Sequence, residues 1–183
     1  RDNKLNYVGM ATYYKVAGSS EPTSYTFTLS NGPKWSIRIS RIEGADPNNP
    51  INAHGGAFGH DDDDVKAPSI TTSVYNALVM AFYTNKKDAT WTPANGTTEV
   101  YDRPNTQQGL TSNMMAYYVK SSPGATGSKT ANPSRDEVWV AQQIAIRPGQ
   151  SKSGSSAGRT STPIASNTPV EEVPLFEESQ GSA

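Results

Sequence analysis

The feature that most constrains this chain is an alternation of apolar and polar side chains with a period of two. In Trp35–Ile42 (WSIRISRI), Trp35, Ile37 and Ile39 alternate with serine and arginine. Val138–Arg147 (VWVAQQIAIR) alternates again, and we expect its even-numbered residues, from Val138 to Ile146, on one face. This period is that of a strand with one buried and one wet face. Since no strong helical period competes, the sequence predicts an all-β protein, an antiparallel, jelly-roll-like β-sandwich.

Turn signals separate further strand candidates along the chain. We expect strands at Leu5–Val16, Ser24–Leu29, Thr97–Tyr101 and Met114–Val119. Asn31-Gly32-Pro33 is typical of a hairpin turn leading into Trp35–Ile42. Ser73–Thr84 is the most apolar segment, and its length and i, i+3, i+4, i+7 spacing also allow a helix. Its Val and Tyr content and the bracketing Ser and Thr favour a central strand instead.

Three segments carry weaker patterns. Trp91–Gly96 contains Pro93, which predicts an edge strand or a loop. Gly44–Pro68 has no convincing strand and reads as a long loop, a kind that often carries function. Pro123–Arg135 reads as a polar loop of Gly, Ser, Thr and Pro.

The composition changes after Gly149. We expect one β-sandwich domain over residues 1–149 and an extended tail over residues 150–183. Residues 150–168 are rich in Ser, Gly and Thr and have too little apolar surface to fold by themselves. The segment that follows, Pro169–Ser179 (PVEEVPLFEES), differs: four glutamates surround Val173, Leu175 and Phe176. An acidic peptide with an apolar centre is typical of a docking segment, and a solvated acidic end is the alternative.

Composition also excludes several classes of function. The formal net charge of the 183 residues is −1, so no basic field attracts nucleic acid or an anionic membrane. No apolar run approaches the roughly 20 residues of a membrane helix. Cysteine is absent, which excludes disulfides, thiolate metal ligands and cysteine nucleophiles. Both histidines fall in one Gly/Asp-rich stretch, so a Ser-His-Asp triad has little to draw on, and we predict a non-enzymatic protein.

The sharpest charge cluster is a run of four carboxylates after His60. It consists of Asp61, Asp62, Asp63 and Asp64. Dense carboxylates suit Ca²⁺, and His60 or His54 suits a transition metal. The run lacks both the glycine and the bidentate glutamate of an EF-hand loop. We expect a solvated acidic loop, with a Ca²⁺ site as the alternative and no other cofactor.

Aromatic side chains beside polar loops are candidates for stacking on sugars. They are Trp91, Tyr101 and the pair Tyr13-Tyr14. The alternative for each is packing in the core or at a sheet edge.

Several stretches together look like parts of one known module. They are Tyr13–Leu29 continuing into Ile39–Ile51, Ala67–Ala81 continuing into Trp91–Tyr101, and Met114–Arg147. Over residues 7–148 the series resembles a β-sandwich module of phage virion proteins (tail, fibre or decoration proteins) and of large bacterial extracellular proteins. The matching motifs are turns and strand edges, so the resemblance implies display and adhesion and carries over no active site.

We therefore expect a structural protein of a virion or an extracellular surface, present in many copies or as a homo-oligomer. Its tail would anchor it to other proteins of the assembly, by strand addition or by filling an apolar groove with Leu175 and Phe176. Display in many copies would turn weak contacts into avidity. The alternative is a carbohydrate-binding or adhesion module for host-surface glycans, assisted by Ca²⁺ at the acidic run.

Overall fold

The structure, a computed structural model, describes residues 8–28, 36–60, 64–103, 111–149 and 171–173. Within them the chain forms strands and no helix. The strands are β1 (Ile39–Arg41), β2 (Ile51–Gly59), β3 (Val65–Ala67), β4 (Thr71–Thr72), β5 (Ala77–Asn85), β6 (Trp91–Thr92), β7 (Thr98–Arg103), β8 (Ser112–Lys120), β9 (Gly124–Ala125), β10 (Lys129–Pro133), β11 (Trp139–Ile146) and β12 (Glu171–Val173). Every described strand pair is antiparallel. The predicted all-β, antiparallel fold is confirmed, whereas the jelly-roll order of connections stays a prediction.

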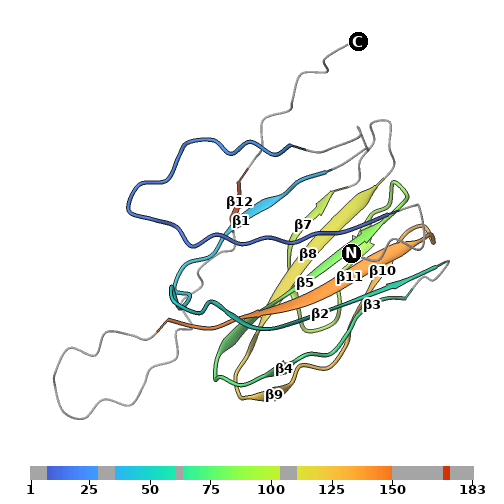
Figure 1. The fold of residues 1–183 in the computed structure, drawn as a ribbon. Helices are drawn as coiled ribbons and strands as arrows, with labels where there is room; N and C mark the ends of the chain where they lie inside the picture. Colours follow the sequence, from blue (N-terminus) through green and yellow to red (C-terminus); the bar gives the residue numbers. More distant parts are fainter. Residues whose placement is uncertain (1–7, 29–35, 61–63, 104–110, 150–170, 174–183) are drawn as a thin grey trace.

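A five-stranded central sheet, in the order β2-β11-β5-β8-β7, forms the middle of the molecule (Figure 1). Two of its three nine-residue strands, β5 and β8, come from strongly apolar segments of the chain. β5 lies between β11 and β8, which confirms that Ser73–Thr84 contributes a strand and not a helix. Because both faces of this sheet are covered, β5 has apolar residues at successive positions and not at alternate ones.

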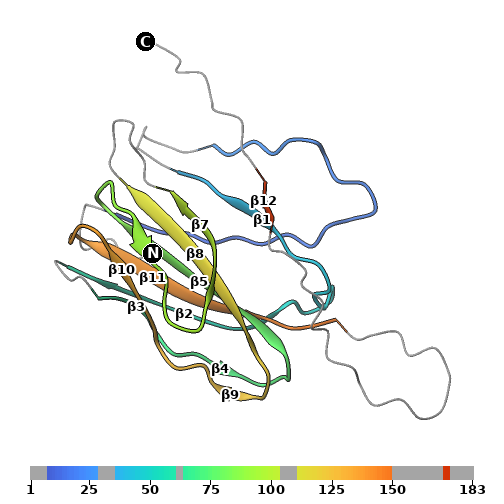
Figure 2. The same cartoon turned by 180° about the vertical axis from the view of Figure 1, so that it is seen from behind.

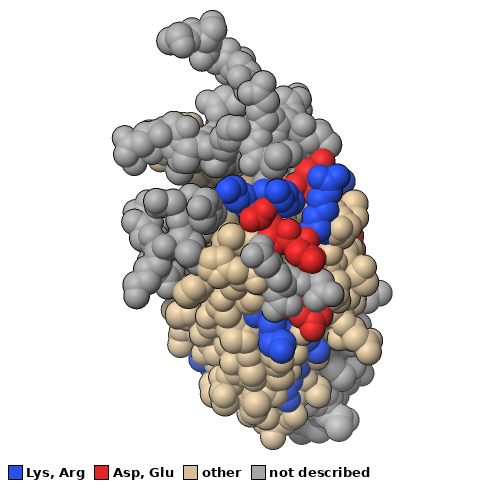
Figure 3. Space-filling view, turned by 90° about the vertical axis from the view of Figure 1, so that its right-hand side faces the viewer, with Lys and Arg blue, Asp and Glu red and all other residues tan. Residues whose placement is uncertain are grey.

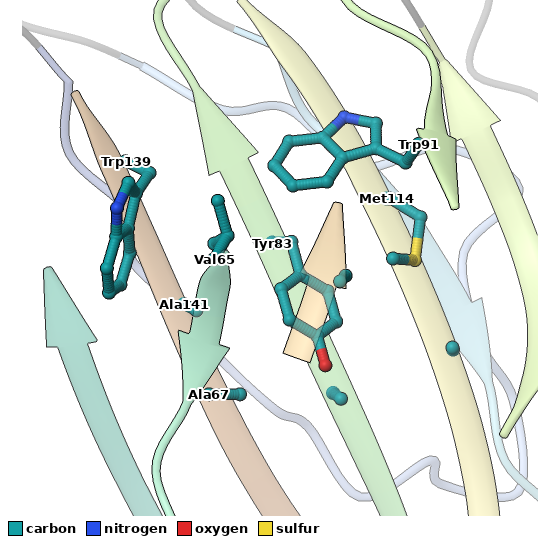
Figure 4. Close-up of a cluster of buried hydrophobic side chains, with 10 residues drawn as sticks. Val65, Ala67, Tyr83, Trp91, Met114, Trp139 and Ala141 are labelled. Carbon is teal, nitrogen blue, oxygen red and sulfur yellow. The ribbon is translucent and has the colours of Figure 1, made fainter. Parts of the chain in front are cut away.

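Two small sheets cover one face of the central sheet, β3-β10-β6 and β4-β9 (Figures 1 and 2). The core between the layers is shown in Figure 4 and includes Val65, Ala67, Tyr83, Trp91, Met114, Trp139 and Ala141. The rings of Tyr83 and Trp91 lie 6.0 Å apart between centroids, in tilted contact. The Tyr83 hydroxyl donates a hydrogen bond to the Lys129 carbonyl of β10 (3.0 Å), which ties the two layers together. Burial also raises the pKa of Tyr83.

The opposite face of the central sheet, which we call the outer face, is covered by β1 and the segment after it. Ile42 and Ala45 pack against Met80, Met115 and Ile146 there. β12 pairs with β1, and these two strands lie on the other side of the central sheet from β4 and β9 (Figures 1 and 2). The molecule therefore has three layers, and the outer layer has the least strand pairing.

Both faces of β11 are covered, which refines the expectation for this strand. The predicted alternation is present, but the odd-numbered face, with Trp139 and Gln143, is the more deeply buried. Gln143 is fully buried, and its side-chain amide donates to the carbonyls of Pro68 and Gly127 (2.9 Å each). These two bonds satisfy a polar group that would otherwise be costly to bury.

The prediction of two long loops was wrong in part, because both segments contain strands. Gly44–Pro68 includes β2 and β3, and Pro123–Arg135 includes β9 and β10. β2 pairs with β11 along its whole length, although its sequence (INAHGGAFG) is dominated by small residues. A Cβ at Gly59 would lie 2.5 Å from the indole ring of Trp139, so glycine is required for this packing.

Two predicted strands are absent from the described residues. Leu5–Val16, described from residue 8, and Ser24–Leu29, described to residue 28, contain no strand. Their Tyr, Val and Thr content favours extended backbone, but a strand also needs a partner for its main-chain hydrogen bonds. Of the described part of Trp35–Ile42, which begins at residue 36, only Ile39–Arg41 pairs. The hairpin turn expected at residues 31–33 lies outside the described residues.

Candidate assembly surface

The two rings predicted to stack on sugars, Trp91 and Tyr101, lie in the core. Their side chains are only 6% and 7% exposed. The Trp91 indole N–H donates to the Ser112 hydroxyl (2.9 Å), which is itself buried. Neither ring offers a face to a sugar, so this prediction was wrong and the alternative, core packing, holds for both.

The acidic run falls largely outside the described residues. Asp61, Asp62 and Asp63 are not among them. Asp64 is exposed, and its carboxylate accepts a hydrogen bond from the Asn132 amide (2.9 Å). Within the ranges that the structure describes, no three His, Cys, Asp or Glu side chains gather in a way that suits a metal ion. The Ca²⁺ alternative for this run stays a prediction.

The predicted tail anchor is described only in its first part. Leu175 and Phe176 lie outside the described residues, while Val173 is the last residue of β12. The main chain of β12 pairs with β1 of the same chain. The division between a domain and a tail at residue 149 stays a prediction.

The segment over residues 8–28, here called the N-terminal loop, is the most apolar exposed surface that the structure describes. Eight large apolar side chains are exposed within the described residues, and five of them lie in this loop. They are Tyr13, Tyr14, Val16, Tyr25 and Phe27. Tyr13 and Tyr14 are the most exposed pair, at 86% and 66%. Figure 1 shows the loop in blue, crossing the front of the central sheet and then turning back in a wide arc beyond β1.

A single carboxylate holds the turn of this loop. Glu21 accepts a hydrogen bond from the Gly18 main-chain N–H (2.6 Å) and pairs with the Lys15 ammonium (2.6 Å). The Tyr25 hydroxyl donates to the same carboxylate, and the Lys15 ammonium lies 5.3 Å from the centroid of the Tyr25 ring. These hydrogen bonds, with that of Lys15 first, lower the pKa of Glu21 to about 2. This role of Glu21 depends on side-chain contacts and could not be predicted from the sequence pattern.

The first half of the loop is attached to the outer face. The Thr12 hydroxyl donates to the side-chain oxygen of Gln142 in β11 (2.8 Å). Between described residues, no hydrogen bond joining two main-chain atoms involves residues 8–28. Among the described residues, the contacts that hold the loop are therefore made through side chains.

On the face that Figure 3 shows, the charged side chains form no patch comparable to the exposed apolar side chains of the N-terminal loop. Lys and Arg side chains lie beside Asp and Glu side chains there and do not merge into a field of one sign. Elsewhere, an open hollow of about 230 Å³ is lined by Asp46, Val74, Arg147, Pro148 and Gly149. This lining contains a carboxylate and a guanidinium but no nucleophilic side chain beside a base.

The described part of the chain contains no helix long and apolar enough to cross a membrane. Comparisons with protein-family models, with curated proteins and with solved structures found no match for this chain.

Proposed function

We propose that this chain is a non-enzymatic structural component of a virion or of an extracellular surface assembly, as a decoration, fibre or tail protein. One observation carries the proposal: the N-terminal loop, with its turn fixed by Glu21, exposes five large apolar side chains. Exposed apolar patches on a folded domain mark sites of interaction with other proteins, membranes or ligands.

The energy available from this loop is sufficient for a specific contact. Three of its apolar side chains, Val16, Tyr25 and Phe27, are between 43 and 46% exposed, and Tyr13 and Tyr14 are more so. Covering them would contribute on the order of 5 kcal/mol, at about 25 cal/mol per Å² of apolar surface. Tyrosine rings also lose little conformational entropy on binding, which is why they are common anchors at interfaces.

The main chain of the loop supports the same function. Its residues are of the types that favour strands, yet within the described residues the loop makes no main-chain ladder. A strand from another protein of the assembly would satisfy these groups by strand addition, and alternate side chains would provide specificity. Repetition over many copies would combine these weak contacts into a high overall avidity.

The test compares two double variants of the full chain. Each is produced in the cells that make the assembly, the assembly is isolated, and the occupancy of the variant in it is measured. Tyr13→Ser with Tyr14→Ser removes the most exposed rings of the loop. Tyr75→Ser with Val119→Ser removes exposed apolar side chains elsewhere, at 68% and 55% exposure, and is the matched control. We expect the first variant to lose most of its occupancy and the control to keep it. Full occupancy of the loop variant would refute the proposal.

A second candidate function, carbohydrate binding, is favoured by the exposure of Tyr13 and Tyr14. These are the rings predicted for sugar stacking that the structure leaves accessible. A glycan array with the full chain, with and without EDTA, tests this candidate and any Ca²⁺ assistance from Asp61–Asp64. Binding that disappears in Tyr13→Ser with Tyr14→Ser supports it, whereas no binding to any glycan excludes it.

A further inference from the structure

Strand β12, in the C-terminal segment, pairs with strand β1 of the same chain, so β1 is the strand that accepts it. In the antiparallel register of β1 and β12, Arg41 lies opposite Glu171, Ser40 opposite Glu172 and Ile39 opposite Val173. A basic residue thus faces an acidic one, and a β-branched apolar residue faces another. Opposite charges and β-branched pairs at facing positions stabilise antiparallel strands. The match favours this register over a slip by one residue, because a slip in either direction would remove the Ile39–Val173 pair, and a slip in one direction would also remove the opposite-charge pair.

The acceptor strand β1 is fixed to the domain. The Ser40 hydroxyl contacts the Met115 sulfur (3.6 Å) in the middle of the central sheet. Ile42, just after β1, packs into the outer-face cluster with Met115 and Tyr101. β12, in turn, lies close to β7. The position that receives β12 is therefore built by residues of the domain and does not depend on where the donor segment comes from.

The donor segment can reach beyond its own domain. Residues 150–170 connect it to the end of β11, and this length of chain spans at most about 70 Å when extended. A domain of this size has a diameter of about 40 Å, so a neighbouring copy in contact lies within reach. The pairing comprises three residue pairs, so it opens at low cost.

We propose that, in the assembly, β1 of one copy accepts the segment Glu171–Val173 of a second copy of this chain. This proposal rests on the proposed function, since it needs copies held close together. The exchanged and the closed forms make the same strand contacts, so the balance between them depends on chain connection and local concentration. At the millimolar local concentrations of an array, a neighbour's segment competes with the chain's own. Because each copy both donates and accepts, the contact links copies into rings or open chains.

Single-cysteine variants test the exchange, because the chain has no cysteine of its own. Full-length Ser40→Cys and full-length Glu172→Cys, with tags of different mass, are mixed in a thiol–disulfide buffer at rising concentration. A disulfide between the two variants can form only in trans. The control mixture is Ser128→Cys with Glu172→Cys, because Ser128 is an exposed serine next to β10, on the far side of the central sheet. Arg41→Cys with Glu171→Cys is a second register pair, should the first disturb the contact with Met115.

We expect the Ser40→Cys mixture to give at least about tenfold more mixed dimer than the control, with a yield that rises toward millimolar concentration. The double variant Ser40→Cys with Glu172→Cys should form an internal disulfide when dilute. A yield no higher than the control for both register pairs overturns the exchange, whether or not the internal disulfide forms. The proposed function is judged separately by incorporation of the N-terminal loop variants, so either proposal can fail while the other stands.

Discussion

A buried hydrogen-bond chain around Trp91 makes the sharpest prediction about the scaffold. The Trp91 indole N–H donates to the Ser112 hydroxyl (2.9 Å), which donates to the side-chain oxygen of Asn85 (2.8 Å). The Asn85 amide donates to the Arg135 carbonyl (2.9 Å). Ser112 and Asn85 are fully buried, so no solvent can replace a lost partner. The chain links β6, β8 and β5, and this is why Trp91 is a core residue and not a sugar platform.

Replacing Ser112 by alanine removes one oxygen and leaves the Trp91 indole N–H without the acceptor it has here. The Asn85 oxygen keeps its bond from the Lys87 main-chain N–H (3.1 Å), so one buried group loses its partner and not two. An unsatisfied buried donor costs about 1–3 kcal/mol. For a domain of this size, a loss of about 2 kcal/mol lowers the melting temperature by about 4–8 °C.

Urea unfolding followed by tryptophan fluorescence measures this loss as a change in midpoint at constant slope. Ser122→Ala, at an exposed serine in the turn after β8, is the matched control and should change the free energy of unfolding by less than about 0.5 kcal/mol. In a Trp91→Phe background, Ser112→Ala should cost less, because no indole N–H remains to be left unpaired. A cost of Ser112→Ala equal to that of the control would refute the reasoning.

Three further predictions concern packing, pH and the tail. Gly59→Ala should destabilise the fold by about 1–3 kcal/mol, since its Cβ would overlap the Trp139 ring. Gly56→Ala should cost far less in the same urea assay, because its Cβ would lie 3.2 Å from the flexible Gln142 side chain and 3.4 Å from the Ala141 carbonyl oxygen. The lowered pKa of Glu21 means that its carboxylate holds the loop turn above its ordinary pKa of 4.5 and releases it as the pH falls toward about 2. An NMR titration of Glu21 should show a midpoint near 2, and one near 4.5 would contradict the contacts. Deleting residues 150–183 should leave the melting temperature nearly unchanged, because β12 contributes three residue pairs, and a large drop by calorimetry would contradict this.

The strands that could be predicted from the sequence are those with large apolar side chains. β5, β8 and β11 each show this signal, and they form the middle of the central sheet. The prediction that one face of β11 is exposed to solvent was inaccurate, because an alternation of side chains indicates only which of the two faces is more deeply buried. It cannot show that a second layer covers the other face, where Gln142 meets the N-terminal loop.

Strands built of small or polar residues could not be predicted, for a physical reason. β2 forms a strand because it pairs with β11. Its glycines weaken the strand pattern in the sequence, and one of them, Gly59, allows the Trp139 ring to lie directly on the main chain. β10 (KTANP) has a weak local pattern, yet Ala131 within it is fully buried against the central sheet. Such segments become strands through pairing with distant parts of the chain, and a local pattern carries no information about those partners.

The opposite error, strands predicted where none forms, has a different meaning. Ser24–Leu29 alternates Tyr25 and Phe27 with Ser and Thr, a pattern that favours a strand, yet its described part forms no strand. A conflict between local preference and observed structure is most often found at functional sites, where a partner completes what the isolated chain leaves open. Both conflicts of this kind, in residues 8–16 and 24–28, lie in the outer layer, and so does the short pairing of β1 with β12. The inner layers, by contrast, are closed by a continuous core. We infer that the outer layer is the part of this protein that depends on other chains, and that the isolated domain is stable without completing it.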